Sequence, residues 1–110
     1  MRRRPAVLLA VFLAAGLATP AAADWRYCLA RGPAGTVYLS TPFSSVDAMV
    51  SLGEAFGRRL DTEKRAHDPV QCPRAGDAAA LRAMREAALR FNRQEGLTVV
   101  EVNWAPDTKP

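Results

Sequence analysis

The residues best suited to acid–base chemistry lie in one polar segment, residues 61–76, with the sequence DTEKRAHDPVQCPRAG. It contains the only histidine of the chain, His67, directly before Asp68. A catalytic triad would need this pair together with a serine, and no G-x-S-x-G motif presents a serine on a sharp turn. We therefore expect His67 to be a solvated loop residue, and we expect no catalytic residues.

Metal and cofactor sites are not indicated by the remaining residue patterns. Zinc sites combine several cysteine, histidine or carboxylate ligands at short spacings, whereas the two cysteines here are far apart and the histidine is single. The stretch RGPAG at residues 31–35 lacks both the lysine and the spacing of a phosphate-binding loop. We therefore predict no bound metal and no cofactor.

The N-terminal segment, residues 1–23, has the layout of a secretory signal peptide. Three arginines at positions 2–4 precede an uncharged stretch, residues 6–17, that is too short to span a bilayer. The alanines at 21–23 suit a signal peptidase, so we expect cleavage after Ala23 rather than retention as a membrane anchor. Cys28 lies too far from this point for a lipid anchor. We predict a periplasmic or extracellular protein with no membrane span after cleavage.

Cys28 and Cys72 are the only cysteines, and an exported chain reaches compartments in which disulfides persist. Their wide spacing is unlike the C-x-x-C pattern of reactive thiol pairs. We predict a structural disulfide between them. The chain-entropy model gives such a bridge about 4 kcal/mol of stabilisation, which matters because so short a chain buries only a modest core.

The basic character of the chain comes mainly from its first residues. The full sequence carries 15 lysines and arginines against 11 acidic residues, and three of those arginines belong to the predicted signal peptide. The mature chain is therefore close to neutral. Nucleic-acid binding relies on clustered basic side chains, so we predict no nucleic-acid partner.

Two groups of residues are candidates for binding a partner. One is a set of charged side chains in segment 61–76, because structureless connections longer than about 12 residues are usually functional or disordered. Its members are Lys64, Arg65, His67 and Asp68. The other is a set of strand aromatics that could share an open sheet face and stack on sugars, although such residues more often pack in the core. Its members are Trp25, Tyr27 and Tyr38.

Three strands are expected to position these groups. Residues 25–30 (WRYCLA) alternate in a way that predicts a strand, and residues 36–40 (TVYLS) predict a second strand joined to it as a hairpin. Residues 97–104 (LTVVEVNW) predict the last strand. One of its sides carries Val100, Val102 and Trp104.

Two helices are predicted between the second and the last strand. The first has Ser44 as its N-cap and contains Gly53 and Gly57, which we interpret as sites of close backbone approach. The second runs from the N-cap Asp77 to Gly96. The predicted buried faces are Val46, Met49, Val50, Phe56 and Leu60 in the first helix and Leu81, Met84, Ala88 and Phe91 in the second, which leaves Leu89 exposed.

The order strand-strand-helix-helix-strand predicts an α+β fold, in which two helices pack on one face of a small three-stranded sheet with one disulfide. We expect the last strand to pair beside the first by a right-handed crossover. Residues 24–105 would form this single domain, followed by a loose C-terminal tail at 106–110.

These features favour a small exported, non-catalytic domain that binds a protein partner or a component of the cell envelope. The alternative is a carbohydrate or peptidoglycan-fragment binder that uses the aromatic face, and a small hydrolase is the least favoured reading. No feature indicates an oligomeric state.

Overall fold

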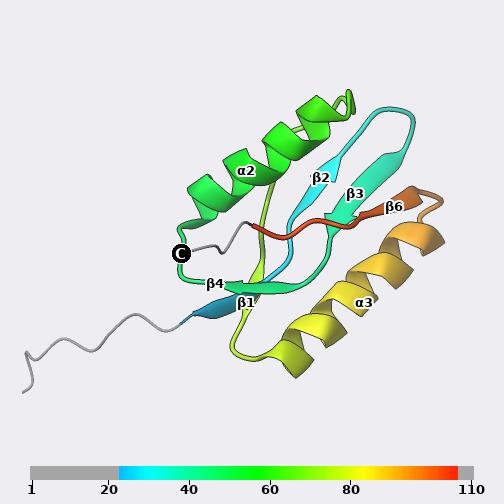
Figure 1. The fold of residues 1–110 in the computed structure, drawn as a ribbon. Coiled ribbons are helices and arrows are strands. Elements are labelled where there is room, and N and C mark those ends of the chain that lie inside the picture. The colour runs from blue at the N-terminus through cyan, green and yellow to red at the C-terminus, as the bar shows by residue number, and fades with distance from the viewer. Residues whose placement is uncertain (1–22, 107–110) are drawn as a thin grey trace, which may run out of the picture.

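The computed structural model describes residues 23–106. A thin layer of strands lies between two helices, which run along opposite sides of it (Figure 1). The strands are β1 (Asp24–Arg26), β2 (Leu29–Arg31), β3 (Thr36–Ser40), β4 (Phe43–Ser45), β5 (Arg74–Ala75) and β6 (Thr98–Val102), and the helices are α2 (Met49–Thr62) and α3 (Ala78–Gln94).

The strands form two three-stranded sheets. In the first, β1 is central and antiparallel to both β4 and β5; in the second, β3 is central, antiparallel to β2 and parallel to β6. The chain passes from β1 to β2 through Tyr27 and Cys28. At this break the Cys28 amide donates to the hydroxyl of Ser40 at 2.8 Å, so a side chain replaces the strand carbonyl that would continue the ladder.

Side chains alternate along the central strand β3 and divide the core into two layers. Tyr38 packs toward α2, whereas Val37 and Leu39 pack toward α3. The strand β6 alternates in the same way, and Val100, Val102 and Trp104 all belong to the side of α2, as predicted. The α2 layer also contains Cys28, Ala30, Phe43, Leu52, Phe56, Leu60 and Cys72, and the α3 layer also contains Tyr27, Leu81 and Leu89.

The predicted disulfide between Cys28 and Cys72 is confirmed. Its S–S distance is 2.08 Å, and both residues are fully buried in the α2 layer. Next to it, Leu29 and Gln71 exchange two backbone hydrogen bonds of 2.7 and 2.9 Å. The bridge and this pair together fix the segment after α2 along the outer edge of β2.

The helix α3 is well determined by local sequence. Asp77 is its N-cap, because Asp77 Oδ1 accepts a hydrogen bond from the Ala80 amide at 2.8 Å. Gly96 follows the helix with a φ of 82°, a conformation that glycine adopts without a steric cost. Both predicted boundaries of this helix are therefore confirmed.

The start of α2 differs from the prediction. Ser44 is not its N-cap, because residues 43–45 pair with β1 as strand β4 and the helix begins only at Met49. The residue before it, Ala48, provides no side-chain cap. This shift also changes the buried face, which is Leu52, Phe56, Gly57 and Leu60.

The α+β fold with two helices is confirmed, while its arrangement differs from the prediction in three respects. There are two small sheets, the helices cover opposite faces of the β2-β3-β6 sheet, and β6 lies beside β3. Both faces of β3 carry apolar side chains, so both need a helix to cover them. The strand β6 pairs with β3 because the far edge of β2 is already bonded to Gln71.

The predicted signal peptide, apart from Ala23, and residues 107–110 of the predicted tail lie outside the described residues, so these two assignments stay predictions. Within residues 23–106, α2 has 14 residues and α3 has 17, and neither is long and apolar enough to cross a membrane.

Candidate functional site

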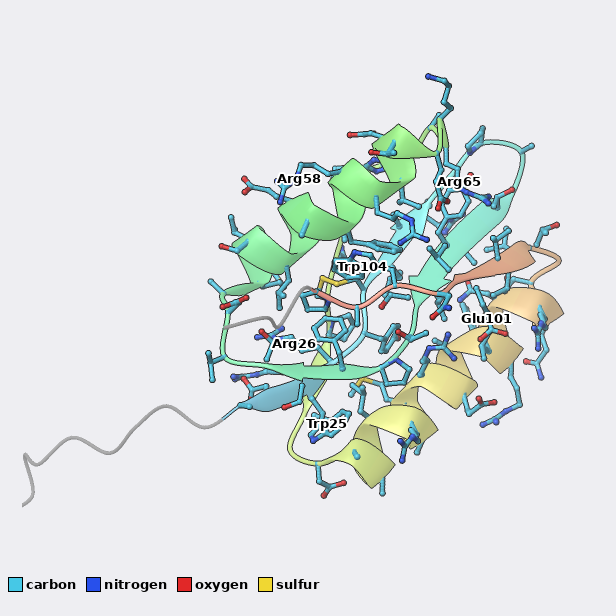
Figure 2. The ribbon with its side chains drawn as sticks, in the orientation of Figure 1. Trp25, Arg26, Arg58, Arg65, Glu101 and Trp104 are labelled. Atoms are coloured by element: carbon cyan, nitrogen blue, oxygen red, sulfur yellow. A yellow bond between two sulfur atoms is a disulfide. The ribbon has the colours of Figure 1, made fainter. Side chains whose placement is uncertain are left out.

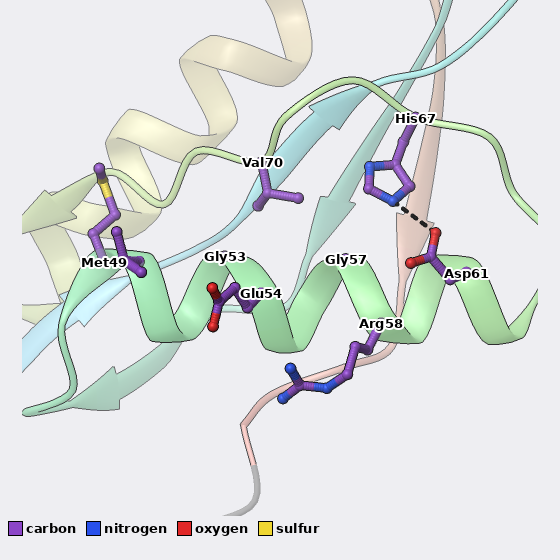
Figure 3. A pocket seen from close by; sticks show the side chains of 9 residues that line it. Met49, Gly53, Glu54, Gly57, Arg58, Asp61, His67 and Val70 are labelled. Carbon is purple, nitrogen blue, oxygen red and sulfur yellow. Dashed lines mark hydrogen bonds and ion pairs between the residues drawn. The ribbon is translucent and has the colours of Figure 1, made fainter.

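A groove of about 530 Å³ lies between α2 and the segment that returns from its C-terminal end toward the disulfide (Figure 3). Gly53 and Gly57 of α2 face Val70 and His67 of the returning segment. The groove is also lined by Met49, Val50, Glu54, Arg58 and Asp61. It therefore combines a small apolar floor with charged groups of both signs.

The two glycines of the floor have more room than close packing would need. A Cβ atom on Gly53 would lie 3.6 Å from the Val70 carbonyl oxygen, and one on Gly57 would lie 3.4 Å from His67 Cε1. Both are ordinary van der Waals distances, so the approach is looser than the sequence led us to expect. Glycine costs a helix about 1 kcal/mol relative to alanine, and packing among the described residues does not explain that cost.

Both nitrogens of the His67 ring have hydrogen-bond partners, and one of these bonds joins the returning segment to α2. Its Nδ1 lies 2.8 Å from the backbone carbonyl oxygen of Asp68, and its Nε2 lies 3.1 Å from Asp61 Oδ1 (Figure 3). Both partners accept hydrogen bonds, and a neutral imidazole has only one N–H to donate. The geometry therefore suits the doubly protonated, positively charged ring.

The electrostatic surroundings of His67 agree with this geometry. The Asp68 backbone carbonyl raises the pKa of His67 above 6.5, and the Asp61 carboxylate raises it further, while partial burial opposes both effects. A histidine held protonated by two acceptors is poorly placed to take a proton from a nucleophile. This arrangement suits an ion pair better than general-base catalysis.

Three large apolar side chains are exposed where α2 begins. Val46, Met49 and Val50 are 65%, 49% and 68% exposed, and the last two line the groove. Their predicted burial is wrong, because the later start of α2 turns Leu52 toward the core instead. We call these three residues the apolar rim; a group of this kind beside a groove is typical of an interaction surface.

The four charged residues predicted to bind a partner are only partly brought together. His67 lines the groove, and it shares a smaller hollow with Asp68 next to Gly32 and Pro33. Lys64 lies in the turn after α2 with a φ of 59°. Arg65 has a packing role instead, because its guanidinium lies 5.5 Å from the centre of the Tyr38 ring.

The three predicted aromatic residues do not form an exposed face. Tyr27 is buried in the α3 layer and Tyr38 in the α2 layer, on opposite sides of the strands. Burial also raises the pKa of the Tyr27 hydroxyl. Trp25 is partly buried against the α3 layer, while Trp104 lies on the other side among Phe43 and Phe56 (Figure 2).

In the part of the chain that the structure describes, no cluster of three or more histidine, cysteine or carboxylate side chains is arranged to hold a metal ion. No protein-family model matches the chain, and the searches of curated proteins and solved structures found no significant similarity.

The residues that line the groove have a recognisable spacing in the sequence, but the same spacing is also that of a buried helix face. Gly53 and Gly57 are four residues apart and therefore lie on the same side of a helix. Met49 and Val50 precede Gly53 by four and three residues, about one turn, and all four residues line the groove. From helical spacing alone we placed these four residues on the buried face of the helix, whereas in the structure they line the groove beside the core.

Proposed function

We propose that this protein is a small exported, non-catalytic domain that binds a protein partner through the groove and the apolar rim. The observation that carries the proposal is that two glycines of α2 without a packing role follow three exposed apolar side chains, of which Met49 and Val50 belong to the helix and Val46 precedes it. The glycines lower helix stability, and the exposed side chains lower solubility. A partner bound here would cover the exposed side chains and could approach the helix closely at the glycines.

The chemistry of the lining favours a protein partner over a carbohydrate. Protein interfaces combine an apolar centre with a polar edge, and here Glu54 and Arg58 line the groove together with Met49, Val50 and Val70. Stacking on a sugar ring would require an exposed aromatic side chain, and the aromatic residues predicted for that role are buried or partly buried. The geometry of His67 also disfavours a hydrolase.

Export is part of the proposal, and it rests on the buried disulfide together with the predicted signal peptide. Disulfides persist mainly in oxidising compartments outside the cytosol. The intact mass of the secreted protein should correspond to a chain that begins at Asp24. A secreted mass that retains residues 1–23 would contradict the cleavage site.

The binding surface can be tested with two variants that each remove exposed apolar side chains, on the side of α2 or on α3. One replaces the apolar rim by serine (V46S/M49S/V50S), and the control replaces Phe91, which is 60% exposed on α3 (F91S). Each full-length chain, with an affinity tag at its C-terminus, is recovered from the envelope of cells that produce it. Melting temperatures are compared first, because all four side chains are exposed and the two variants should unfold close to the wild type.

The expected result is a protein that co-purifies with the wild type and with F91S, is lost with the rim variant, and binds purified wild-type domain directly. Loss with F91S and retention with the rim variant would move the binding surface to α3. Equal recovery of every protein by both variants would contradict the proposed site.

A further inference from the structure

The returning segment is held against α2 by few contacts between the turn at Lys64 and the bonded residue Gln71. The Asp68 amide donates to the Arg31 carbonyl at 2.8 Å, which fixes the segment to the end of β2. At the end of α2 the Lys64 and Arg65 amides donate to the Asp61 and Leu60 carbonyls at 2.9 Å, and further along Val70 packs beside Gly53. Between these points its link to α2 is the His67 ring, which bonds Asp61 and lies over Gly57. Between Arg65 and Val70, the position of this ring therefore determines how closely the segment approaches the helix beside the groove.

The link depends on the charge of the ring. When His67 is protonated, Nδ1–H donates to the Asp68 carbonyl and Nε2–H donates to the Asp61 carboxylate, as the distances of 2.8 and 3.1 Å require. When His67 is neutral and keeps the bond to Asp68, the lone pair of Nε2 faces a carboxylate oxygen. Two acceptors in contact repel, and the other neutral tautomer keeps the bond to Asp61 only by giving up the bond to Asp68. In either case the neutral ring makes one hydrogen bond in place of two and no ion pair, so its hold on α2 is weaker.

The charged groups around His67 come from two elements. From α2, Glu54, Arg58 and Asp61 line the same groove, and Asp61 makes the direct contact. From the segment itself, Asp68 contributes its backbone carbonyl. The β2–β3 turn contributes Gly32 and Pro33, which carry no charge. Asp61 is therefore the only carboxylate among the described residues that is bonded to the ring.

We propose that His67 is a protonation-dependent latch that holds the returning segment closed against α2 and thereby sets the width of the groove. The use of the latch in binding rests on the proposed function of the groove, whereas the latch itself is a property of the chain alone. The closed state is the low-pH state.

The direction of the pH effect follows from the contacts of the ring. Its pKa in the folded protein is raised by the Asp68 carbonyl and then by Asp61. A raised folded value means that the stabilisation is fully present below pH 6.5, the ordinary value for histidine, and is lost as the pH rises through the folded value. The latch therefore opens in a window above pH 6.5.

A single histidine makes the latch directly observable. Its imidazole signals are followed by nuclear magnetic resonance across this pH range in the full chain. Hydrogen-exchange protection factors, which correct for the intrinsic pH dependence of exchange, are measured for the bonded amides of the segment, Lys64, Arg65 and Asp68. The variant D61N removes the carboxylate from the link. The matched control D68N keeps the backbone carbonyl that bonds the ring and changes only the neighbouring side chain.

In the wild type and in D68N, His67 should titrate above pH 6.5, and protection of the Lys64, Arg65 and Asp68 amides should fall roughly twofold to fivefold through the same transition, as expected for a partly exposed ion pair. In D61N the midpoint should be lower, and the protection should already be low at acidic pH. An unchanged midpoint in D61N, or protection that does not follow the titration of His67, would overturn the proposal. Neither measurement involves a partner, so failure of the groove as a binding site would be recognised separately.

Discussion

The two helices cover opposite faces of the same sheet and differ in how they are built. The helix α3 has a side-chain N-cap, no glycine between Ala78 and Gln94, and a buried arginine that donates hydrogen bonds through Nε and Nη2. The helix α2 has no side-chain cap, two glycines in its middle and an apolar rim at its start. The features of α3 therefore favour helix stability, whereas α2 has features that lower its stability and that we interpret as a binding surface.

The α2 layer compensates for these features with the disulfide and with aromatic packing. Trp104 lies 5.8 Å from Phe43 in an edge-on arrangement and 5.1 Å from Phe56 between ring centres. Both cysteines lie in the same layer. The disulfide and the aromatic contacts in the layer beneath α2 thus offset the stability lost through its missing cap and its two glycines.

The largest effect is expected from removal of the disulfide. With a sequence separation of 44 between the cysteines, the variant C28A/C72A should lose about 4 kcal/mol of unfolding free energy in the chain-entropy model. Denaturant unfolding of the oxidised wild type and the variant measures the difference. A loss below about 1 kcal/mol would mean that the α2 layer does not depend on the bridge.

A smaller but substantial effect is expected in the α3 layer from Arg85, which is only 7% exposed. Its Nε donates to the Ser40 carbonyl at 2.9 Å, and its Nη2 lies 2.9 Å from Glu101 Oε1. The variant R85M leaves the buried carbonyl without its donor and should cost about 2 kcal/mol. The control E101Q should cost less than about 1 kcal/mol, because the Glu101 side chain is largely exposed. Equal losses in R85M and E101Q would show that the ion pair, rather than the buried carbonyl, controls the stability.

The N-cap of α3 provides a third comparison. The variant D77A removes the acceptor of the Ala80 amide and should lower the unfolding free energy by about 1 kcal/mol. The matched variant S44A changes an exposed residue of β4 and should have an effect within about 0.5 kcal/mol. Chemical denaturation of both variants measures the contrast, and a reversed order would restore Ser44 as the N-cap of α2.

The smallest stability effects are expected at the glycines of α2, and they have the opposite sign. Because a methyl group fits at both positions, G53A and G57A should each stabilise the protein by up to about 1 kcal/mol. The same variants should weaken partner recovery, since a methyl group would make the floor of the groove shallower. Destabilisation by both variants would show that the glycines are needed for packing after all.

Elements with strong local signals were predictable from the sequence. Asp77 and Gly96 gave both ends of α3, the alternating residues 98–102 gave β6, and the two cysteines could pair only with each other in an exported chain. Each of these features depends on residues close together in the sequence or, for the disulfide, on a cysteine with only one possible partner.

The failures concern partners that are distant in the sequence. Leu89 is buried and Phe91 is exposed, the reverse of the prediction, because Arg85 occupies a core position that apolar periodicity treats as surface. Its burial is possible only because Ser40 and Glu101 accept its hydrogen bonds. The groove was missed for a related reason, since the start of α2 depends on the pairing of β4 with β1.

We propose that a partner binds the α2 side of the molecule and not the α3 side. Site-specific photo-crosslinking in living cells tests it most directly, with the same photoreactive amino acid placed at Val50 in one chain and at Phe91 in another. Both positions are exposed to a similar extent, at 68% and 60%. The account predicts a discrete cross-linked protein from position 50 and none from position 91, and a discrete product from position 91 alone would contradict it.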